Sequence, residues 1–417
     1  MPAVWGILSL RPDSSGRFTA EIDRSSNREQ HNTAQFGRIS MLTLGRMRGN
    51  PALSRRVTLW GDGGIYPQTV PKLPSRAPTA RPTQGELALI EAIRRRVASA
   101  GSPALRLGIG DDCAILTPPP GHELLVTTDL SLEGRHFRRE WHPARSIGHR
   151  TLARGMSDLA AMGAEPLAAF LSLALPRSVA AKPRWLRGFL DGLLALAAEH
   201  GVPLAGGDTS ESPPCTTGEA FVLADIVLLG TTPTGTALRR SGARPGDAIY
   251  VTGSLGGAAT ELEHLGRDPK FFRNARSDGR HPHLFPQPRL STGLTLRQRG
   301  LATACIDLSD GLSTDLAHLC TASGVAAEIR LPALPLSPLL RGAGKTAARN
   351  AALHGGEDYE LIFTAPASAV MPKSVGGIRL TRIGQIVRAS HRRPQIITIA
   401  ANGRRAPLDP GGWEHFG

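Results

Sequence analysis

Seven aspartates in this chain stand beside glycine, serine or threonine in short segments. They are Asp111 and Asp112 in GIGDDCA, Asp129 in TTD, Asp158 in MSDLAAMG, Asp208 in GGDTS, and Asp307 and Asp310 in IDLSDG. A solvated helix face would instead carry mixed Glu and Lys. Carboxylates suit Mg²⁺, which proteins hold through one or two of them together with substrate phosphates. We therefore predict a metal-bridged phosphate site built from strand-end and turn aspartates, although the spacing alone does not bring them together.

Glycines accompany these carboxylates in GIGDD, GGDTS, TGSLGGAA and HGGEDYE. Glycine lets backbone N–H groups approach a phosphate, and helix N-termini add partial positive charge. Taken singly, each Asp-Gly segment could equally form a turn or a helix cap, and that alternative stays open. Taken together, the segments indicate a site for nucleotide phosphates.

Other chemistry is less well supported. Gly344-Lys345-Thr346 looks like the end of a P-loop, but that motif requires Gly at the position of Leu339, so we predict a surface loop. No G-x-S-x-G segment occurs, and no covalent nucleophile is expected. His136, in EGRHF, is the only histidine in a motif-like context, and a structural role for it remains open.

The elements that must position these residues alternate along the chain. Periodicity predicts helices at 85–100, 144–162, 185–200, 256–266 and 313–323, and strands at 123–128, 167–175, 221–229, 248–252, 305–308, 359–364 and 376–387. Both halves mix strands with helices, so we predict the α/β (α+β) class. We expect two mixed α/β domains, at 83–235 and 236–417, the first carrying the ATP and Mg²⁺ site. Residues 1–82 lack sustained periodicity, and we expect a disordered or mis-annotated N-terminal extension.

The amino-acid composition argues against several classes of function. The formal net charge is +14, but residues 1–80 hold 11 Lys and Arg against 5 Asp and Glu, and aromatics are only 5% of the chain. A basic stripe with interleaved aromatics is therefore missing, and we expect no nucleic-acid partner. The four cysteines are scattered without C-x-x-C spacing, which predicts a reducing, cytoplasmic setting. No apolar run reaches the ~18–20 residues that cross a membrane, so we expect a soluble protein without a membrane partner.

From about Gly85 to Gly417 the motifs follow one order. It runs GIGDDCA, TTDLSLEGRHF, SDLAAMGAEP, GGDTS, RSGARPGD, VTGSLGG, IDLSDGL, HGGEDYELIF and GGWEHF. This order resembles the bacterial thiamine-monophosphate kinases, members of the aminoimidazole ribonucleotide synthetase-like superfamily of ATP-using enzymes. TTD with EGRHF, GGEDYEL and GWEHF distinguish the kinases from their relatives. The resemblance implies ATP-dependent phosphorylation of thiamine monophosphate to thiamine diphosphate, by direct Mg²⁺-assisted transfer within thiamine diphosphate biosynthesis. It also implies a homodimer whose N-terminal halves pair their sheets.

The same resemblance implies a role for each matching residue. The predicted Mg²⁺ ligands are Asp112, Thr127, Thr128, Asp129, Asp158, Asp208, Asp307 and Asp310; the predicted ATP contacts are Gly207, Asp208, Arg240 and Ser309; and the predicted acceptor pocket comprises His136, Glu357 and Trp413. Trp413 would pack on the flat rings of the acceptor.

Two positions depart from the family pattern. Gly257 stands where relatives usually carry Asp, and Leu190 stands where some have an aromatic ATP contact. Two rivals also remain. One is another ATP-using synthetase of the superfamily, such as a selenophosphate or aminoimidazole ribonucleotide synthetase, and the other is a non-catalytic ATP-binding or nucleic-acid-binding protein. The intact set of aspartates argues against loss of catalysis.

Overall fold

The computed structural model describes residues 8–12, 18–22, 86–97, 102–213, 220–390 and 395–414. The chain divides into two compact units, Met1–Ala80 and Arg81–Gly417. Within the first unit, β1 (Leu8–Pro12) pairs antiparallel with β2 (Phe18–Ile22). The rest of the N-terminal extension expected at 1–82 lies outside the described residues. The second unit carries every predicted site residue.

A four-stranded sheet organises the N-terminal half of the second unit. Its strands, in spatial order, are β5 (His122–Leu132), β8 (Leu223–Pro233), β6 (Glu165–Leu175) and β7 (Leu204–Glu211). β8 pairs antiparallel with both β5 and β6, whereas β6 and β7 are parallel. The remaining elements of this half are α1 (Glu86–Val97), the short pair β3 (Leu105–Leu107) and β4 (Ile115–Leu116), α2 (Ala144–Ala161), α3 (Arg177–Ala180) and α4 (Pro183–Glu199).

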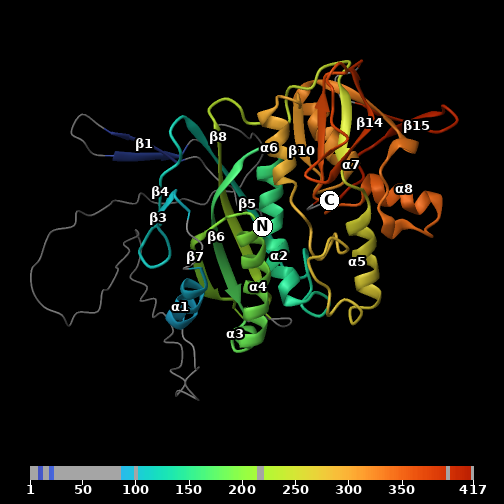
Figure 1. Ribbon diagram of the computed structural model, residues 1–417. Helices are drawn as coiled ribbons and strands as arrows, with labels where there is room; N and C mark the ends of the chain where they lie inside the picture. The colour runs from blue at the N-terminus through green and yellow to red at the C-terminus, as the bar shows by residue number, and fades with distance from the viewer. Residues whose placement is uncertain are drawn as a thin grey trace, which may run out of the picture. The chain divides into compact units, whose positions relative to one another are not determined.

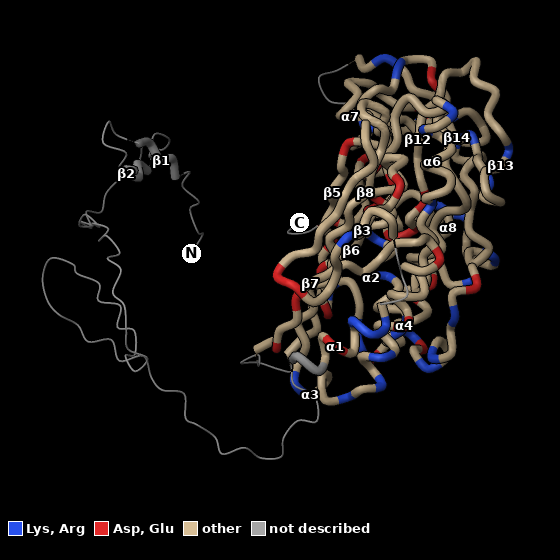
Figure 2. The backbone as a smooth tube through the Cα atoms, turned by 60° about the vertical axis from the view of Figure 1, so that its left-hand side comes forward, with Lys and Arg blue, Asp and Glu red and all other residues tan. Residues whose placement is uncertain are grey.

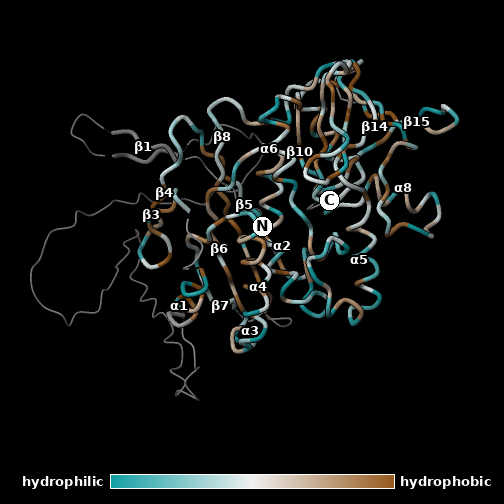
Figure 3. Tube along the Cα trace, in the orientation of Figure 1, coloured by the Kyte–Doolittle hydropathy of each residue, from teal (hydrophilic) through white to brown (hydrophobic). Residues whose placement is uncertain are grey.

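The two faces of this sheet differ in burial. Side chains alternate along a strand, and Ala224, Ile226 and Leu228 of β8 are completely buried on the side where α2 packs. On the other face Val126 and Leu130 of β5 are 61% and 45% exposed. Strands β6 and β8 carry hydrophobic colours in Figure 3. One face of the sheet therefore forms core, and the other leaves apolar side chains accessible.

The C-terminal half contains an eight-stranded sheet. Its main path runs β10-β12-β9-β14-β11-β15-β16, and β13 pairs with β14. The strands are β9 (Ala248–Thr252), β10 (Ala304–Asp307), β11 (Val325–Arg330), β12 (Leu361–Ala365), β13 (Ser374–Val375), β14 (Ile378–Arg388), β15 (Ile396–Ile399) and β16 (Arg405–Leu408). The helices are α5 (Gly257–Arg267), α6 (Leu290–Gln298), α7 (Leu312–Ser323) and α8 (Lys345–His354), with single 3-10 turns η1 (Leu331–Ala333) and η2 (Pro338–Leu340).

Helix α2 joins the two halves. It is buried along most of its length and packs against β5 and β8 on one side and against α6 and β10 on the other. Figure 1 shows it running between the N-terminal sheet and the C-terminal elements. Its crossing with α4 is close: an added Cβ at Gly148 would lie 1.8 Å from the carbonyl oxygen of Phe189. The segment MSDLAAMG, at the end of α2, is thus placed at the junction of both halves.

The predicted α/β class is confirmed, and each predicted element has a counterpart within a few residues. Three local expectations were wrong. Asp129 and Asp208, expected at a strand end or turn, lie within β5 and β7, whereas Asp307 ends β10 and Asp158 lies within the predicted helix α2. Strand β7, which contains GGDTS, was missed because its glycines read as a turn.

The expected surface loop at Gly344-Lys345-Thr346 is instead the start of a helix. Gly344 caps α8, and Lys345 and Thr346 form its first turn, exposed to solvent. The prolines upstream made a helix look unfavourable here. They end at Pro338, within η2, and so do not interrupt α8. No helix among the described ranges is long and apolar enough to span a membrane. Lys and Arg colour short stretches of many elements in Figure 2 and do not form a single stripe on the face shown.

Candidate active site

A cavity of about 530 Å³ lies where both halves contribute side chains. Eight of the predicted site residues line it, namely Asp129, His136, Asp158, Asp307, Ser309, Asp310, Glu357 and Trp413. β5 and α2 supply Asp129 and Asp158, and the end of β10 supplies Asp307. Residues that are far apart in the sequence therefore share one cavity, and we call it the carboxylate cavity.

A second cavity of about 630 Å³ takes three more of the predicted residues. Asp112, Gly207 and Asp208 line it together with apolar groups from α1 and from strands β6 and β7. An added Cβ at Gly207 would lie 1.9 Å from the carbonyl oxygen of Leu171, so close packing against β6 already requires glycine there. The two cavities share none of their lining residues.

The remaining predicted residues are Thr127, Thr128 and Arg240. The Thr127 hydroxyl donates a hydrogen bond to Asp158. Thr128 follows it in β5 and therefore faces the opposite side of the sheet. Arg240 is exposed, and its charge acts on both Asp158 and Asp307. Thr127 and Arg240 thus belong with the carboxylate cavity, and the role of Thr128 stays a prediction.

The carboxylates of this cavity have raised pKa values, because burial disfavours their charged forms. Burial, reinforced by the charge of Asp158, raises the pKa of Asp307 to about 7. Burial raises the pKa of Asp129 to about 6, although Arg154 opposes the shift. Asp158 also has a raised pKa because of burial, partly offset by its hydrogen bond from Thr127. Three carboxylates that repel one another in a buried setting favour a bound cation.

The carboxylate and hydroxyl oxygens of this cavity are ligands that suit Mg²⁺, but they do not form a complete coordination shell. Across the described ranges, no group of three or more His, Cys, Asp or Glu side chains is already arranged to hold a metal ion. Proteins commonly hold Mg²⁺ through one or two carboxylates completed by water and substrate phosphates. Phosphate oxygens would therefore have to supply part of the coordination.

Arg154 is a cavity residue that the sequence motifs did not reveal. Its Nη2 lies 2.6 Å from Asp129, while its Nε and Nη1 are buried without a hydrogen-bond partner in the structure. It stands four residues before Asp158 and so on the same face of α2. The four-residue spacing between Arg154 and Asp158 can be recognised in the sequence. Nothing in the sequence indicates that Asp129 lies opposite Arg154.

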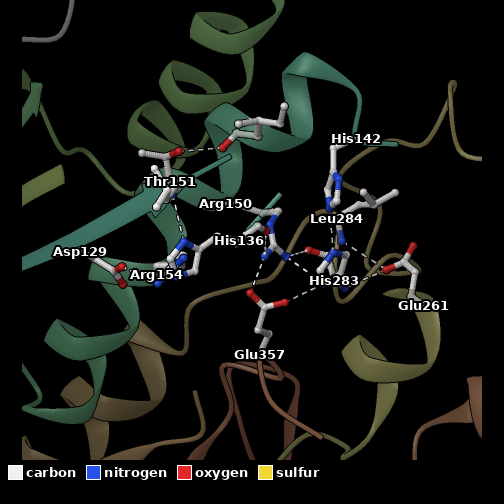
Figure 4. A network of polar contacts seen from close by, with 12 residues as sticks. Asp129, His136, His142, Arg150, Thr151, Arg154, Glu261, His283, Leu284 and Glu357 are labelled. Carbon is white, nitrogen blue, oxygen red and sulfur yellow. Dashed lines mark hydrogen bonds and ion pairs between the residues drawn. The ribbon is translucent and has the colours of Figure 1, made fainter. Parts of the chain in front are cut away.

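The predicted acceptor residues meet in the same cavity. Glu357 accepts a hydrogen bond of 2.6 Å from Arg150, and Arg150 also donates to the carbonyl oxygen of His136 at 3.2 Å (Figure 4). The ring Nδ1 of His136 accepts the N–H of Leu132, which fixes its orientation. Burial raises the pKa of Glu357, but Arg150 and a neighbouring histidine outweigh it and hold the pKa well below its usual value.

Trp413 reaches the cavity from the far end of the chain and is 52% exposed. The backbone N–H of Trp413 donates to the carbonyl oxygen of Asp310 at 3.0 Å. The backbone N–H of the preceding Gly412 donates to the Thr314 hydroxyl at 3.1 Å. Gly411 in turn donates to Ser313 at 3.2 Å. The first turn of α7 therefore anchors the segment that carries the indole.

The structure gives a physical reason for the departure at Gly257. Gly257 begins α5, and an added Cβ there would lie 2.8 Å from Ser337 Oγ and 3.0 Å from Pro282. Asp358 meanwhile accepts the backbone N–H groups of Gly256 and Ala258, at 2.6 and 3.0 Å. A carboxylate therefore already satisfies this helix N-terminus, and a side chain at Gly257 would require Ser337 or Pro282 to shift.

Leu190, the second departure from the family pattern, lies in the hydrophobic core. Its side chain is 2% exposed and packs within the hydrophobic core around α2 and α4. Leu190 lines neither the carboxylate cavity nor the second cavity beside β7.

Comparisons with known proteins agree with this arrangement. The family models for AIR synthase related protein match at residues 110–232 for the N-terminal domain and 244–395 for the C-terminal domain. The thiamine-monophosphate kinase of Salmonella typhimurium is 38% identical over 340 residues, which are 80% of this chain and 98% of that protein.

Solved structures give the same relationship. The crystal structure of thiamine-monophosphate kinase from Stenotrophomonas maltophilia K279a is 38% identical, with a TM-score of 0.65, and the match covers 77% of this chain and 98% of that one. A structure of AaThiL complexed with AMPPCP and TMP is 30% identical, with a TM-score of 0.60 and coverage of 80% and 97%. The two α/β domains of this chain are of the type that these models describe.

Proposed function

The chain belongs to the thiamine-monophosphate kinase family, and we propose that it transfers the γ-phosphate of ATP to thiamine monophosphate, forming thiamine diphosphate. The observation that carries this proposal is the convergence of Asp129, Asp158 and Asp307 with Glu357 and Trp413 in one cavity. Carboxylates that can hold metal ions suit transfer between two phosphates, and an indole beside them suits an acceptor with flat heteroaromatic rings.

The central obstacle is electrostatic. Two like unit charges at ~4 Å repel by roughly 4 kcal/mol at an effective dielectric of 20. Bound Mg²⁺ would supply the positive charge that offsets this repulsion and stabilises the transferring group. In the carboxylate cavity Asp129, Asp158, Asp307 and Asp310 would hold Mg²⁺, with Thr127 beside them. Asp112 and Asp208 would hold a further ion at the second cavity, and Thr128, whose side chain faces the opposite side of β5, stays a predicted ligand only.

The predicted site residues have separate roles in this proposal. Arg240 and Ser309 would contact the ATP phosphates, and Gly207 with Asp208 would line the nucleotide. His136, Glu357 and Trp413 would hold the acceptor. The acceptor phosphate is ionised at neutral pH, so no strong general base is needed to generate a nucleophile. Glu357 is already ion-paired with Arg150, which suits binding better than proton transfer.

We propose direct in-line transfer without a phosphoenzyme. Incubation with γ-³²P-labelled ATP, followed by acid quench, should leave no label on the protein. A trapped ³²P-labelled enzyme intermediate that is chemically competent would overturn direct transfer.

A homodimer completes the proposal, with N-terminal halves of two copies pairing their sheets. Leu124, Val126 and Leu130 of β5 expose apolar side chains on the open face of the N-terminal sheet, and Phe221, just before β8, is also exposed. Exposed apolar patches of this kind mark protein association surfaces. We further place the protein in the cytoplasm, because its cysteines are scattered without a disulfide or metal-site spacing.

The decisive experiment measures ADP release by the purified protein with ATP and Mg²⁺, with and without thiamine monophosphate. Thiamine diphosphate is identified by chromatography. We expect product that requires the acceptor and disappears with EDTA. ATP binding without thiamine diphosphate would instead favour another ATP-using synthetase of the superfamily.

A further inference from the structure

The guanidinium of Arg150 occupies an unusual position between the two halves. Arg150 lies on α2, and its side chain is only 3% exposed. Its Nη2 donates to Glu357 at 2.6 Å and to the carbonyl oxygen of His136 at 3.2 Å. Its Nη1 donates to the carbonyl oxygen of His283. One buried side chain therefore contacts three chain segments that are far apart in sequence (Figure 4).

Glu357 is fixed on its second oxygen as well. Oε2 lies 3.0 Å from Nδ1 of His283, so each carboxylate oxygen has its own partner. His283 is itself held: its backbone N–H donates to Glu261 at 2.8 Å, and its Nε2 lies 3.0 Å from Nε2 of His142. Figure 4 shows these groups as one connected network around Glu357.

The backbone at Glu357 explains why it needs such support. Its φ is 67°, in the left-handed region that non-glycine residues rarely adopt. Such conformations persist only where the surroundings determine them, and they cluster at functional sites. Its N–H donates to the carbonyl oxygen of Ser309 at 2.8 Å. The charge-assisted hydrogen bond from Arg150 to Oε1, together with His283 at Oε2, gives the directional contacts that hold the carboxylate in place.

We propose that Arg150 is the positioning residue of the acceptor pocket, fixing the spacing between His136 of the N-terminal half and Glu357 of the C-terminal half. This inference rests on the proposed function, because it assumes that these two residues bind the phosphorylated acceptor. Arg150 acts through them, since its hydrogen bonds go to Glu357, His136 and His283 and it does not line the cavity itself. Its removal should therefore weaken acceptor binding selectively, whereas loss of an ordinary buried ion pair should not.

The test compares steady-state kinetics of Arg150→Met and Arg150→Lys with the full-length protein. For Arg150→Met we expect KM for thiamine monophosphate to rise about tenfold or more, since a displaced binding group commonly has this effect. KM for ATP should change by less than about twofold. Arg150→Lys keeps a positive charge beside Glu357 and should recover much of the loss.

A matched control removes a comparable ion pair whose two residues do not line the cavity. Arg289 holds Glu360 with two contacts of 2.6 Å, and both side chains are largely buried. Arg289→Met should lower the unfolding midpoint without changing the ratio of the two KM values. If Arg150→Met does not fold, Arg150→Gln takes its place under the same criterion.

The outcomes separate the two hypotheses. Absence of acceptor-dependent ADP release by the wild-type protein would overturn the proposed function and this inference with it. An active wild type whose Arg150 variants change both KM values in equal proportion would overturn the inference alone. So would an unchanged acceptor KM in Arg150→Met, or equal loss in the Met and Lys variants.

Discussion

The hydroxyl of Ser157 donates a hydrogen bond of 2.7 Å to Oδ2 of Asp307. Ser157 lies on α2, and Asp307 ends β10, so this bond crosses between the two halves of the unit. The next residue on α2, Asp158, accepts a hydrogen bond from Thr127 in the N-terminal sheet. Two consecutive residues of α2 thus form hydrogen bonds to the two sheets, and two carboxylates of the cavity, Asp158 and Asp307, take part in them.

Asp158→Asn should reduce the rate severely. The substitution keeps the size of the side chain but removes one charge from the carboxylate cavity. Loss of one group that stabilises transferring charge typically costs about 10²–10³-fold in kcat, and we expect a fall in that range. ADP release at saturating ATP and acceptor measures it. The exposed α5 pair Arg267–Glu263 provides a control, since Glu263→Gln should retain activity. Full activity in Asp158→Asn would contradict the assignment.

Ser157→Ala should destabilise the fold. The substitution leaves Oδ2 of the buried Asp307 without its donor, and an unsatisfied buried polar group costs about 1–3 kcal/mol. Urea unfolding at neutral pH measures the change in free energy. Thr321 also carries a helix hydroxyl, but it is exposed on α7. Thr321→Ala is expected to stay within about 0.5 kcal/mol of wild type, and equal losses in the two variants would argue against the Ser157 contact.

Gly412→Ala should impair acceptor binding. An added Cβ would lie 2.0 Å from the carbonyl oxygen of Asp310 and 2.7 Å from Thr314 Oγ1, so the segment must move and carry Trp413 with it. We expect KM for thiamine monophosphate to rise about tenfold, because a small displacement of a binding group is costly. Gly344→Ala is the control, since a Cβ there meets nothing within 4 Å. An unchanged acceptor KM would show that Trp413 does not bind the acceptor.

Val126→Arg should disrupt the proposed dimer. Val126 is 61% exposed on the open face of the N-terminal sheet, and a charge there would be buried on association. Sedimentation velocity should show a shift from dimer to monomer. Val370 is 92% exposed in the C-terminal half, and Val370→Arg should leave the oligomeric state unchanged. A wild-type protein that sediments as a monomer would refute the dimer directly.

Stability should fall in acid partly because of His149. Burial, opposed by a hydrogen bond to Pro286, lowers the pKa of His149 to about 4. Its folded-state pKa lies below the unfolded value of about 6.5, so the unfolded chain binds the proton first as pH falls. The contribution is complete above about pH 6.5 and is lost as pH falls toward about 4, amounting to about 3 kcal/mol.

The measurement is the free energy of unfolding as a function of pH. His149→Gln keeps a donor for Pro286 but cannot titrate, so its stability should fall less steeply between pH 6.5 and 4. His318→Gln, at an exposed position on α7, should follow the wild-type slope. Parallel curves for wild type and His149→Gln would exclude the assigned role.

Much of the fold was predictable because its elements carry local signals. The apolar spacing of α2 and α4 and the β-branched run of β9 depend on neighbours in sequence, and each appears close to its expected bounds. β7 escaped prediction because Gly206 and Gly207 resemble a turn locally. Their absence of side chains is required by contact with Phe170 and Leu171 across the sheet. A requirement imposed by a neighbouring strand cannot be read from the segment itself.

The sequence by itself determined the chemical inventory: the aspartates, their glycines and the motif order that places the chain in its family. Only the tertiary structure decided which of them share a cavity, placing Asp307 beside Asp158 but lining a separate cavity with Asp112 and Asp208. It also revealed Arg150 and Arg154, whose partners lie in other segments. The reason is physical: carboxylate chemistry is a property of each residue, whereas burial, pairing and mutual repulsion depend on distances that only the packed chain sets.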